Sequence, residues 1–478
     1  MSFAAPVFLW YFMPAVLLTY WILPRTWRNG VLAAASLIFY VWGAGKYVFL
    51  LAACIAVNFT AGLALDSHRF RWRPRARRAV LFAAIAWDLG ALLVWKYAGF
   101  ASSQVDSLSR ALGLGGTHII DIALPIGISF FTFHHMSYVI DVYRGDRRAQ
   151  RRLLTFVTYI AMFPQLVAGP IVRYHEIADQ LDEVRPSRLD DFTAGFPRFA
   201  LGLAKKVVVA DTVAPVASAC FAAHGSQLTT TTAWLGAIAY TLQIFFDFSG
   251  YSDMALGLGR MFGFRLPENF NRPYSSVTIT EFWRRWHMSL SRWFRDYVYI
   301  PLGGNRRGEA RTYRNLVTIF VLCGFWHGAA WTFLVWGLFH GGLLVAERVT
   351  GLSGDPHRLP LLLVRRVITM TLVVIGWVFF NATSLPRAFA MLGAMFSAQG
   401  TALPAAVHAT LNHQRTLVLC LALAALLLPR SVTVGRILEY GSGRLATTGR
   451  FATVAVAGPY AAILVAAGTF SPFIYYQF

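Results

Sequence analysis

The chain has 478 residues, of which 56% are hydrophobic and only 14% are charged, and its mean hydropathy is +0.52. This composition excludes an aqueous globular domain and predicts a membrane protein. The formal net charge is +21, but the basic residues lie in short loops beside apolar runs, where they indicate membrane orientation rather than nucleic-acid binding.

Long apolar runs separated by short basic loops predict an all-α polytopic membrane protein, because each helical span needs about 20 apolar residues. The spans that stand out are 7–23, 31–42, 47–65, 79–98, 122–141, 367–384, 414–429 and 452–470. With re-entrant and interfacial helices between them, we expect about ten to twelve transmembrane helices. A single membrane-embedded domain covering residues 1–478 is enough to hold them.

The segment from Asn315 to Ala346 departs from this simple alternation. It has 32 residues without Asp, Glu, Lys or Arg. That is about 48 Å of helix, too long for one straight span and too short for two. We therefore predict a bent or re-entrant hairpin with its tip near residue 330.

His327 lies inside this uncharged run. An ionisable residue within a membrane segment is costly to bury and is a functional candidate by default. Gly324 and Gly328 flank it at GxxxG spacing, which lets a neighbouring backbone or a thin substrate approach closely. The alternative is a neutral imidazole that bonds a neighbouring helix.

Other histidines fit packing better than catalysis. His340 also lies between two glycines at GxxxG spacing, Gly337 and Gly341. Because this pattern occurs twice, we interpret it mainly as a signal of helix packing. His134 and His135 follow an aromatic run and are expected in the core or at an interface.

The stretch FWRRWHMSLSRWFRDYVYIPLGGNR (282–306) is unusually rich in tryptophan and arginine. If 281–297 is one helix, Trp286, Trp293 and Tyr297 share a face and arginines occupy much of the rest. Such a helix fits the cytoplasmic membrane interface, with tryptophan in the headgroup zone. The sharper hypothesis is a surface for a polyanionic cofactor, because arginine forks match phosphate oxygens. The candidate cofactor-binding residues are Trp283, Arg284, Arg285, Trp286 and Arg295.

Two carboxylates, Asp247 and Asp253, lie in FFDFSGYSDMALGLG (245–259). Such groups at the end of an apolar run either orient a histidine or pair with arginine, and both interpretations stay open. The four cysteines form no CxxC pair, so neither a disulfide framework nor a zinc site is indicated. We expect no metal and no tightly bound cofactor.

Seven stretches together carry a family resemblance. They are LPIGISFFTFHHMSYVIDVYRGD (124–146), FPQLVAGPIVRY (163–174), FFDFSGYSDMALGLGRMFGFRLPENFNRPY (245–274), the stretch 282–306, CGFWHGAAWTFLVWGLFHG (323–341), GWVFFNA (376–382) and the terminal SPFIYYQF. On these motifs the chain resembles the membrane-bound O-acyltransferases, and within them the bacterial alginate O-acetylation branch.

The resemblance implies transfer of an acetyl group from a cytoplasmic thioester, acetyl-CoA or another acyl thioester, for O-acetylation of an extracytoplasmic polysaccharide such as alginate. It assigns catalysis to His327 of the WHG motif and makes His287 of the RWH motif a second catalytic candidate. We expect His327 to act as general base, since the ordinary pKa of imidazole, about 6.5, suits that role. Trp326, Asp247 and Asp253 are assigned supporting roles.

The same resemblance implies partners and a location. We expect periplasmic acetyl-transfer proteins, polysaccharide machinery and the lipid bilayer as partners, no nucleic acid, and the bacterial cytoplasmic (inner) membrane as the location. Two alternatives stay open. One is transfer of D-alanyl or another acyl group to a cell-envelope polymer. The other is a transporter or flippase in which His327 and the two aspartates form a relay.

Overall fold

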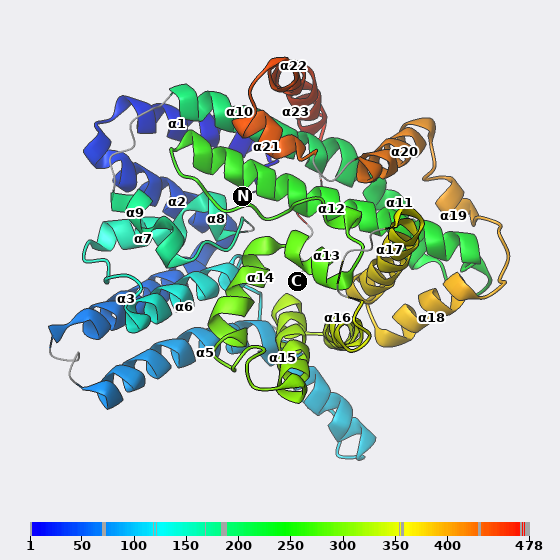
Figure 1. The fold of residues 1–478 in the computed structure, drawn as a ribbon, viewed down its shortest axis with the longest axis horizontal. Coiled ribbons are helices and arrows are strands. Elements are labelled where there is room, and N and C mark those ends of the chain that lie inside the picture. The colour runs from blue at the N-terminus through cyan, green and yellow to red at the C-terminus, as the bar shows by residue number, and fades with distance from the viewer. Residues whose placement is uncertain are drawn as a thin grey trace. The chain divides into compact units, whose positions relative to one another are not determined.

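The computed structural model describes residues 2–68, 73–117, 119–120, 122–167, 169–182, 189–352, 354, 358–428, 432–468, 471 and 473. Within these ranges all regular secondary structure is helical and no strand occurs, so the all-α prediction is confirmed (Figure 1). Of the terminal motif SPFIYYQF, only Ser471 and Phe473 are among the described residues.

The chain divides into two compact units. Unit 1 comprises Met1–Gly195 and Ala255–Pro267, and unit 2 comprises Phe196–Met254 and Glu268–Phe478. Two helices, α10 (Leu189–Ala204) and α12 (Thr230–Met261), contribute residues to both units. This division does not test whether the chain acts as a single membrane-embedded domain, which stays a prediction.

Unit 1 contains the N-terminal helices. They are η1 (Phe8–Phe12), α1 (Met13–Ile22), α2 (Arg28–Ala44), α3 (Val48–Asp66), α5 (Pro74–Ala111), α6 (Ile128–Arg144), α7 (Leu153–Ala161), α8 (Phe163–Leu166) and α9 (Tyr174–Asp182). Helices α3, α5 and α6 pack on one another. Gly62 on α3 leaves room for the ring of Tyr138 on α6, because a Cβ at position 62 would collide with it.

Aromatic rings form much of the core of unit 1. Phe3, Phe8, Phe12, Phe39 and Phe163 pack with centroid separations from 5.0 to 6.3 Å. These separations are typical of tilted and edge-to-face pairs. The cluster fixes the N-terminal helices η1 and α2 against α8.

The predicted spans of unit 1 correspond to observed helices. Residues 7–23, 31–42 and 47–65 match η1 with α1, α2 and α3, and 79–98 lies within the longer α5. The start of the predicted span 122–141 is wrong, because α6 begins only at Ile128. Pro125 lacks a backbone N–H, and Gly127 has a φ of 78° that ends any helix before it.

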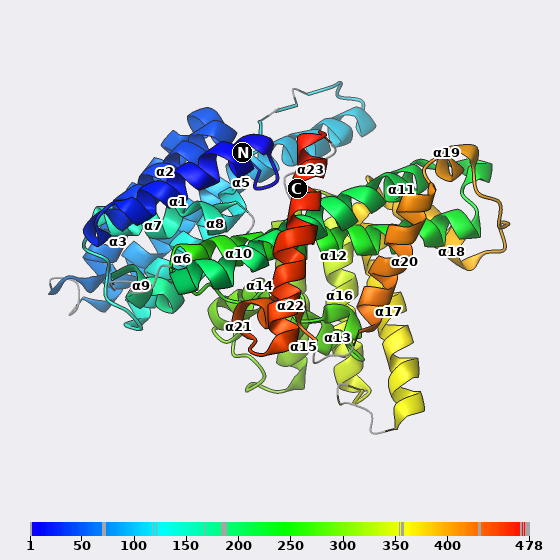
Figure 2. The ribbon, with the colours of Figure 1, turned by 90° about the horizontal axis from the view of Figure 1, so that it is seen from above.

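Unit 2 contains most of the remaining helices. They are α11 (Asp211–Ala222), α13 (Ile279–Arg285), α14 (Met288–Phe294), η7 (Arg295–Tyr299), α15 (Glu309–His327), α16 (Trp331–Val349), α17 (Leu359–Asn381), α18 (Leu385–Phe396), α19 (Ala405–His408), α20 (His413–Leu427), α21 (Val434–Tyr440), α22 (Arg444–Ala452), η8 (Thr453–Ala457) and α23 (Gly458–Ala466). Figure 2 shows α22, η8 and α23 as one continuous rod.

Four helical segments of the described chain are long and apolar enough to cross a membrane. They are Arg25–Asp66, Pro74–Ala111, Leu359–Asn381 and Arg444–Ala466. Shorter apolar helices cover Phe8–Ile22, Leu385–Phe396 and His413–Leu427. The total of ten to twelve spans stays a prediction.

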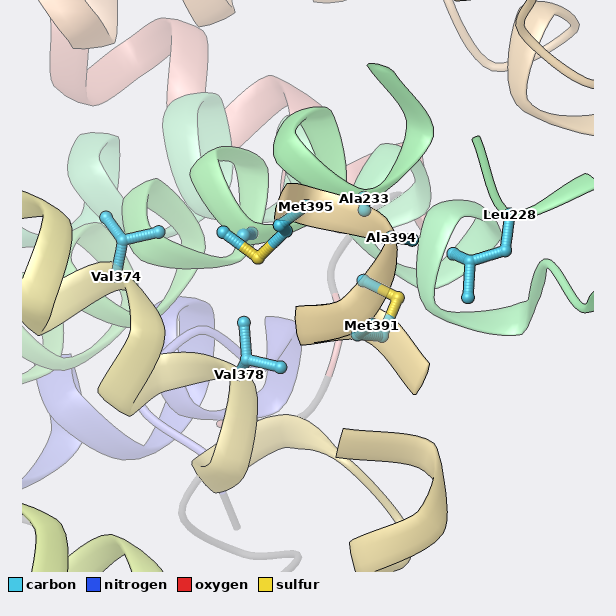
Figure 3. Close-up of a cluster of buried hydrophobic side chains, with 8 residues drawn as sticks. Leu228, Ala233, Val374, Val378, Met391, Ala394 and Met395 are labelled. Carbon is cyan, nitrogen blue, oxygen red and sulfur yellow. The ribbon is translucent and has the colours of Figure 1, made fainter. Parts of the chain in front are cut away.

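A buried apolar cluster holds α12, α17 and α18 together. Figure 3 shows Val374 and Val378 of α17 with Met391 and Met395 of α18, beside Ala233 of α12. All five side chains are at most 7% exposed. Unbranched methionine side chains fill the irregular space between the helices. This packing supports α17, which carries Trp377 and Phe380 toward the site described below.

Helices α15 and α16 form the predicted hairpin, with its turn at residues 328–330. The two helices pack closely because Gly324 and Gly337 face each other, and a Cβ on either would collide with a backbone carbonyl of the other helix. The close approach predicted from the GxxxG spacing is therefore confirmed. Whether the hairpin is re-entrant in the bilayer stays a prediction.

The prediction of one helix over 281–297 is wrong. The chain breaks between α13 and α14, where His287 has a φ of 44° in the left-handed region. The interfacial placement of the tryptophans is also wrong, because Trp283, Trp286 and Trp293 are at most 7% exposed. These rings pack inside the protein, leaving Arg284 and Arg295 exposed.

Candidate active site

His327 is the last residue of α15 and lies at the turn of the hairpin. The helix ends there because Gly328 adopts an extended backbone and its N–H bonds the carbonyl of Gly324. The imidazole is only 4% exposed. Its ring packs edge-to-face against Trp336 and Phe380, each with a centroid separation of 5.1 Å. Aromatic walls on two sides therefore restrict the orientation of this histidine.

His287 occupies the break between α13 and α14. Thr278 and Glu281 fix where α13 begins, since the Thr278 side chain accepts the N–H of Glu281. The imidazole of His287 is 1% exposed and its Nδ1 lies 3.0 Å from Oδ1 of Asn269. Burial lowers the pKa of His287 to about 3, so the ring is neutral near pH 7.

One indole ring connects the two histidines. The ring of Trp326 lies 4.8 Å from that of His327 and 6.0 Å from that of His287. All three residues belong to unit 2. The structure therefore brings His287 together with Trp326 and His327, although His287 precedes His327 by 40 positions in the sequence.

A cavity of about 780 Å³ is lined by Met288, the neighbour of His287, and by Cys323, although His287, Trp326 and His327 themselves are not among its lining residues. Its apolar wall includes Trp283, Phe320 and Cys323. Cys323 precedes His327 by one helical turn, and residues four apart share a helix face. The size falls in the range of about 300 to 1,000 Å³ that is usual for small-molecule sites.

Four arginines line the same cavity: Arg284, Arg292, Arg295 and Arg348. Arg284 and Arg348 are exposed, and Arg295 pairs with its neighbour Asp296 at 2.6 Å. Several guanidinium groups above an apolar wall suit a ligand with an anionic end and an uncharged arm.

The five predicted cofactor-binding residues separate into two groups. Trp283, Arg284 and Arg295 line the cavity. Arg285 instead forms an ion pair with Glu281 at 2.9 Å, and Trp286 packs 4.8 Å from Trp377 in the aromatic core. Arg285 and Trp286 therefore stabilise the fold and do not line this cavity.

Most of the cavity residues were not predicted from the sequence, and two polar ones follow the stretch 282–299. Arg348 comes from the end of α16 and Asn305 from the loop before α15. The one sequence signal for Arg348 is its position directly after the uncharged run 315–346, beside Glu347. The wall near Arg348 is fixed because the carboxylate of Glu347 accepts the N–H of Thr280 at 2.9 Å.

The aspartates pair with cations. Asp253 lies 2.9 Å from Arg198 and 2.6 Å from Lys205, and Asp247 lies 2.8 Å from Lys206. Pairing with a cation is therefore confirmed for both, with lysine in place of arginine at Asp247. Arg198 also binds Glu268 and Glu439, which ties α21 to α10 and α12.

His134, His135 and His340 are core residues, as predicted. His134 and His135 are fully buried in α6 of unit 1. His340 is fully buried in unit 2, where its Nδ1 accepts a hydrogen bond from Trp283 Nε1 at 3.4 Å. Its ring also packs 5.2 Å from Trp336.

Comparison with known proteins relates this site to an enzyme family. The family model for the membrane-bound O-acyltransferases matches residues 146–353, which include both candidate histidines. A probable alginate O-acetylase AlgI of Pseudomonas putida is 47% identical over 397 residues, which cover 83% of this chain and 80% of that protein. The chain belongs to the membrane-bound O-acyltransferase family.

Two further relatives support this membership. A probable alginate O-acetylase AlgI of Azotobacter vinelandii is 46% identical over 83% of this chain and 78% of its own length. A peptidoglycan O-acetyltransferase of Helicobacter pylori is 34% identical over 84% of this chain and 81% of its own length. The protein is thus an O-acyltransferase of the membrane, and the transporter alternative is set aside.

Proposed function

We propose that the protein transfers an acetyl group from cytoplasmic acetyl-CoA to an extracytoplasmic polysaccharide, through periplasmic partner proteins, in the bacterial inner membrane. The observation that carries the proposal is the placement of Trp326 between His287 and His327, next to the arginine-lined cavity. The names of the relatives, probable alginate O-acetylase and peptidoglycan O-acetyltransferase, support an extracytoplasmic polymer as the destination.

The arginine-lined cavity supports acetyl-CoA as donor. The nucleotide end of CoA carries phosphate groups, which guanidinium forks bind bidentately. Its pantetheine arm is uncharged and suits the wall formed by Trp283, Phe320 and Cys323. A thioester at the end of that arm would lie within a helical turn of His327.

In the proposed reaction His327 acts as general base. Its imidazole takes the proton from an attacking hydroxyl, and the oxygen forms a bond with the thioester carbonyl carbon. The carbon–sulfur bond then breaks, and the leaving thiolate takes the proton back from the imidazolium. The products are an O-acetyl ester and free CoA thiol, so the histidine returns to its starting state.

Membrane vesicles of defined orientation test the side and identity of the donor. Radiolabelled acetyl-CoA does not cross an intact bilayer. Inside-out vesicles with the protein are expected to release CoA thiol, and right-side-out vesicles are not. Release from right-side-out vesicles alone would contradict a cytoplasmic donor.

A second donor belongs in the same experiment. D-alanyl charged on a carrier protein replaces acetyl-CoA in parallel vesicles. Acyl transfer from the charged carrier, with no thiol release from acetyl-CoA, would replace acetyl with D-alanyl in the proposal. Polymer labelling in whole cells that contain or lack the gene's neighbours then identifies the acceptor and the partner proteins.

A further inference from the structure

The residue that holds His287 is Asn269, which is fully buried in unit 2. Its Oδ1 lies 3.0 Å from His287 Nδ1, and accepts hydrogen bonds from the hydroxyl of Ser289 at 2.8 Å and its backbone N–H at 3.3 Å. Its own carbonyl accepts the N–H of Met288 at 2.9 Å. One asparagine therefore binds three consecutive residues at the break between α13 and α14.

The backbone at this break is strained. His287 and Arg272 are the two non-glycine residues of the described ranges with positive φ, at 44° and 52°. A left-handed conformation costs a non-glycine residue about 1–2 kcal/mol. Arg272 follows the segment that carries Asn269, and the segment is further fixed because Asn271 N–H bonds the carbonyl of Arg285 at 2.9 Å. Such strain, held by surrounding contacts, is typical of functional sites.

The hydrogen bonds determine where the proton of His287 lies. A backbone N–H can only donate, so the Asn269 side-chain atom facing Ser289 N is the carbonyl oxygen rather than the amide nitrogen. The same oxygen faces His287 Nδ1. Nδ1 must therefore carry a hydrogen. In a neutral imidazole the other nitrogen, Nε2, is then a hydrogen-bond acceptor.

The accepting atom of His287 is buried. Nε2 of His287 has no hydrogen-bond partner among the residues that the structure describes, and neither does the amide Nδ2 of Asn269. Buried polar atoms are nearly always bonded. Phe248 covers the ring edge-to-face at 4.7 Å. His287 itself is not part of the described lining of the arginine-lined cavity, although its neighbour Met288 is.

We propose that Asn269 is a positioning residue that holds His287 with its proton on Nδ1, so that Nε2 accepts a hydrogen bond from a hydroxyl of the acyl acceptor next to the attacking one. The role of the hydroxyl rests on the proposed function, whereas the tautomer follows from the geometry alone. His287 thereby orients the acceptor through one hydroxyl, while His327 removes the proton of the attacking hydroxyl.

Asn269→Asp tests the positioning role through the pH profile. A carboxylate next to Nδ1 favours the imidazolium, which leaves no acceptor at Nε2. The pH below which both ring nitrogens of His287 are protonated, read from its ¹⁵N signals, is expected to rise by about one unit or more, while KM for the donor stays unchanged. Asn269→Ala is expected to lower kcat about 10- to 100-fold. A profile for Asn269→Asp that overlays the wild type would overturn the proposal.

A matched control is Asn412→Asp. Asn412 caps α20 by accepting the N–H of Arg415 at 2.8 Å, and aspartate caps a helix equally well. This variant is expected to keep the wild-type pH profile. A similar shift in Asn412→Asp would show that a new carboxylate acts from a distance, and would overturn the assignment to Asn269.

A spectroscopic readout separates this proposal from the proposed function. With ¹⁵N-labelled histidine, the difference spectrum between the wild type and His287→Gln isolates one of the 12 histidines. The expected signal is a neutral ring protonated on Nδ1, whether or not acetyl transfer is detected. A ring protonated on Nε2 alone would overturn the positioning role. Absence of transfer with the expected tautomer would contradict only the proposed function.

Discussion

The indole of Trp326 lies 6.0 Å from the imidazole of His287, and this contact joins the α15–α16 hairpin to the break between α13 and α14. Trp326 also packs against His327, its neighbour in the chain. One side chain thus contacts both imidazoles, which lie on separate elements.

Truncation of this ring is expected to uncouple the histidines. For Trp326→Ala we predict a fall in kcat of about 100-fold, because small displacements of reacting groups have effects of this size. Loss of the buried ring also lowers the free energy of unfolding by about 3–5 kcal/mol. Steady-state kinetics on the folded fraction and thermal melts in detergent measure the two effects separately. Trp326→Phe should retain most activity, and an active Trp326→Ala would refute the coupling.

The arginine-lined cavity predicts a binding defect. Arg284→Gln and Arg295→Gln are each expected to raise KM for acetyl-CoA about tenfold or more, with kcat little changed, because a charged hydrogen bond contributes about 1.5–3 kcal/mol. Added salt should weaken the binding of acetyl-CoA to the wild type more than its binding to a variant with both substitutions. Arg358→Gln, at an exposed position before α17, is the control. Unchanged KM in both cavity variants would place the donor elsewhere.

The hairpin offers a stability test with an internal control. Gly324→Ala is expected to destabilise the fold by about 1–3 kcal/mol, since the new Cβ would meet the carbonyl of Phe333. Gly342→Ala on the outer side of α16 meets nothing within 4 Å and should stabilise by about 0.5–1 kcal/mol. Thermal melts of both variants check these opposite signs. Equal effects would mean that the helices do not approach at Gly324.

Burial of neutral His287 predicts a loss of stability in acid. Its pKa is about 3 in the folded protein and about 6.5 when unfolded. Between these values the unfolded state binds a proton that the folded state does not, so stability falls as the pH drops below about 6.5. From pH 7 to pH 5 this amounts to about 2 kcal/mol. The drop in melting temperature from pH 7 to pH 5 should be smaller for His287→Gln than for the wild type. An equal drop in the two proteins would contradict a neutral buried ring.

Features set by local sequence were predictable. The length and apolarity of the runs locate α1, α2 and α3, and the uncharged stretch predicts a hairpin whose turn lies at 328–330. Arg285 was instead predicted to bind the cofactor, although its ion pair with Glu281, four residues before it, follows ordinary helix spacing.

Features set by distant residues were not predictable. The stretch 281–297 has the pattern of one interfacial helix, yet Asn269, 18 positions before His287, bonds the chain at the break. Likewise one of the two cations that pair with Asp253 is Arg198, 55 positions away. No local pattern indicates either contact, because each forms only when separate helices pack.

The most direct test of the central claim is CoA release by membranes that contain the wild type or His327→Ala. His413→Ala, at the exposed start of α20, controls for loss of a histidine as such. With radiolabelled acetyl-CoA, the wild type and His413→Ala are predicted to release CoA thiol and pass on the label, while His327→Ala stays at the level of membranes without the protein. Wild-type rates of release by folded His327→Ala would contradict the account.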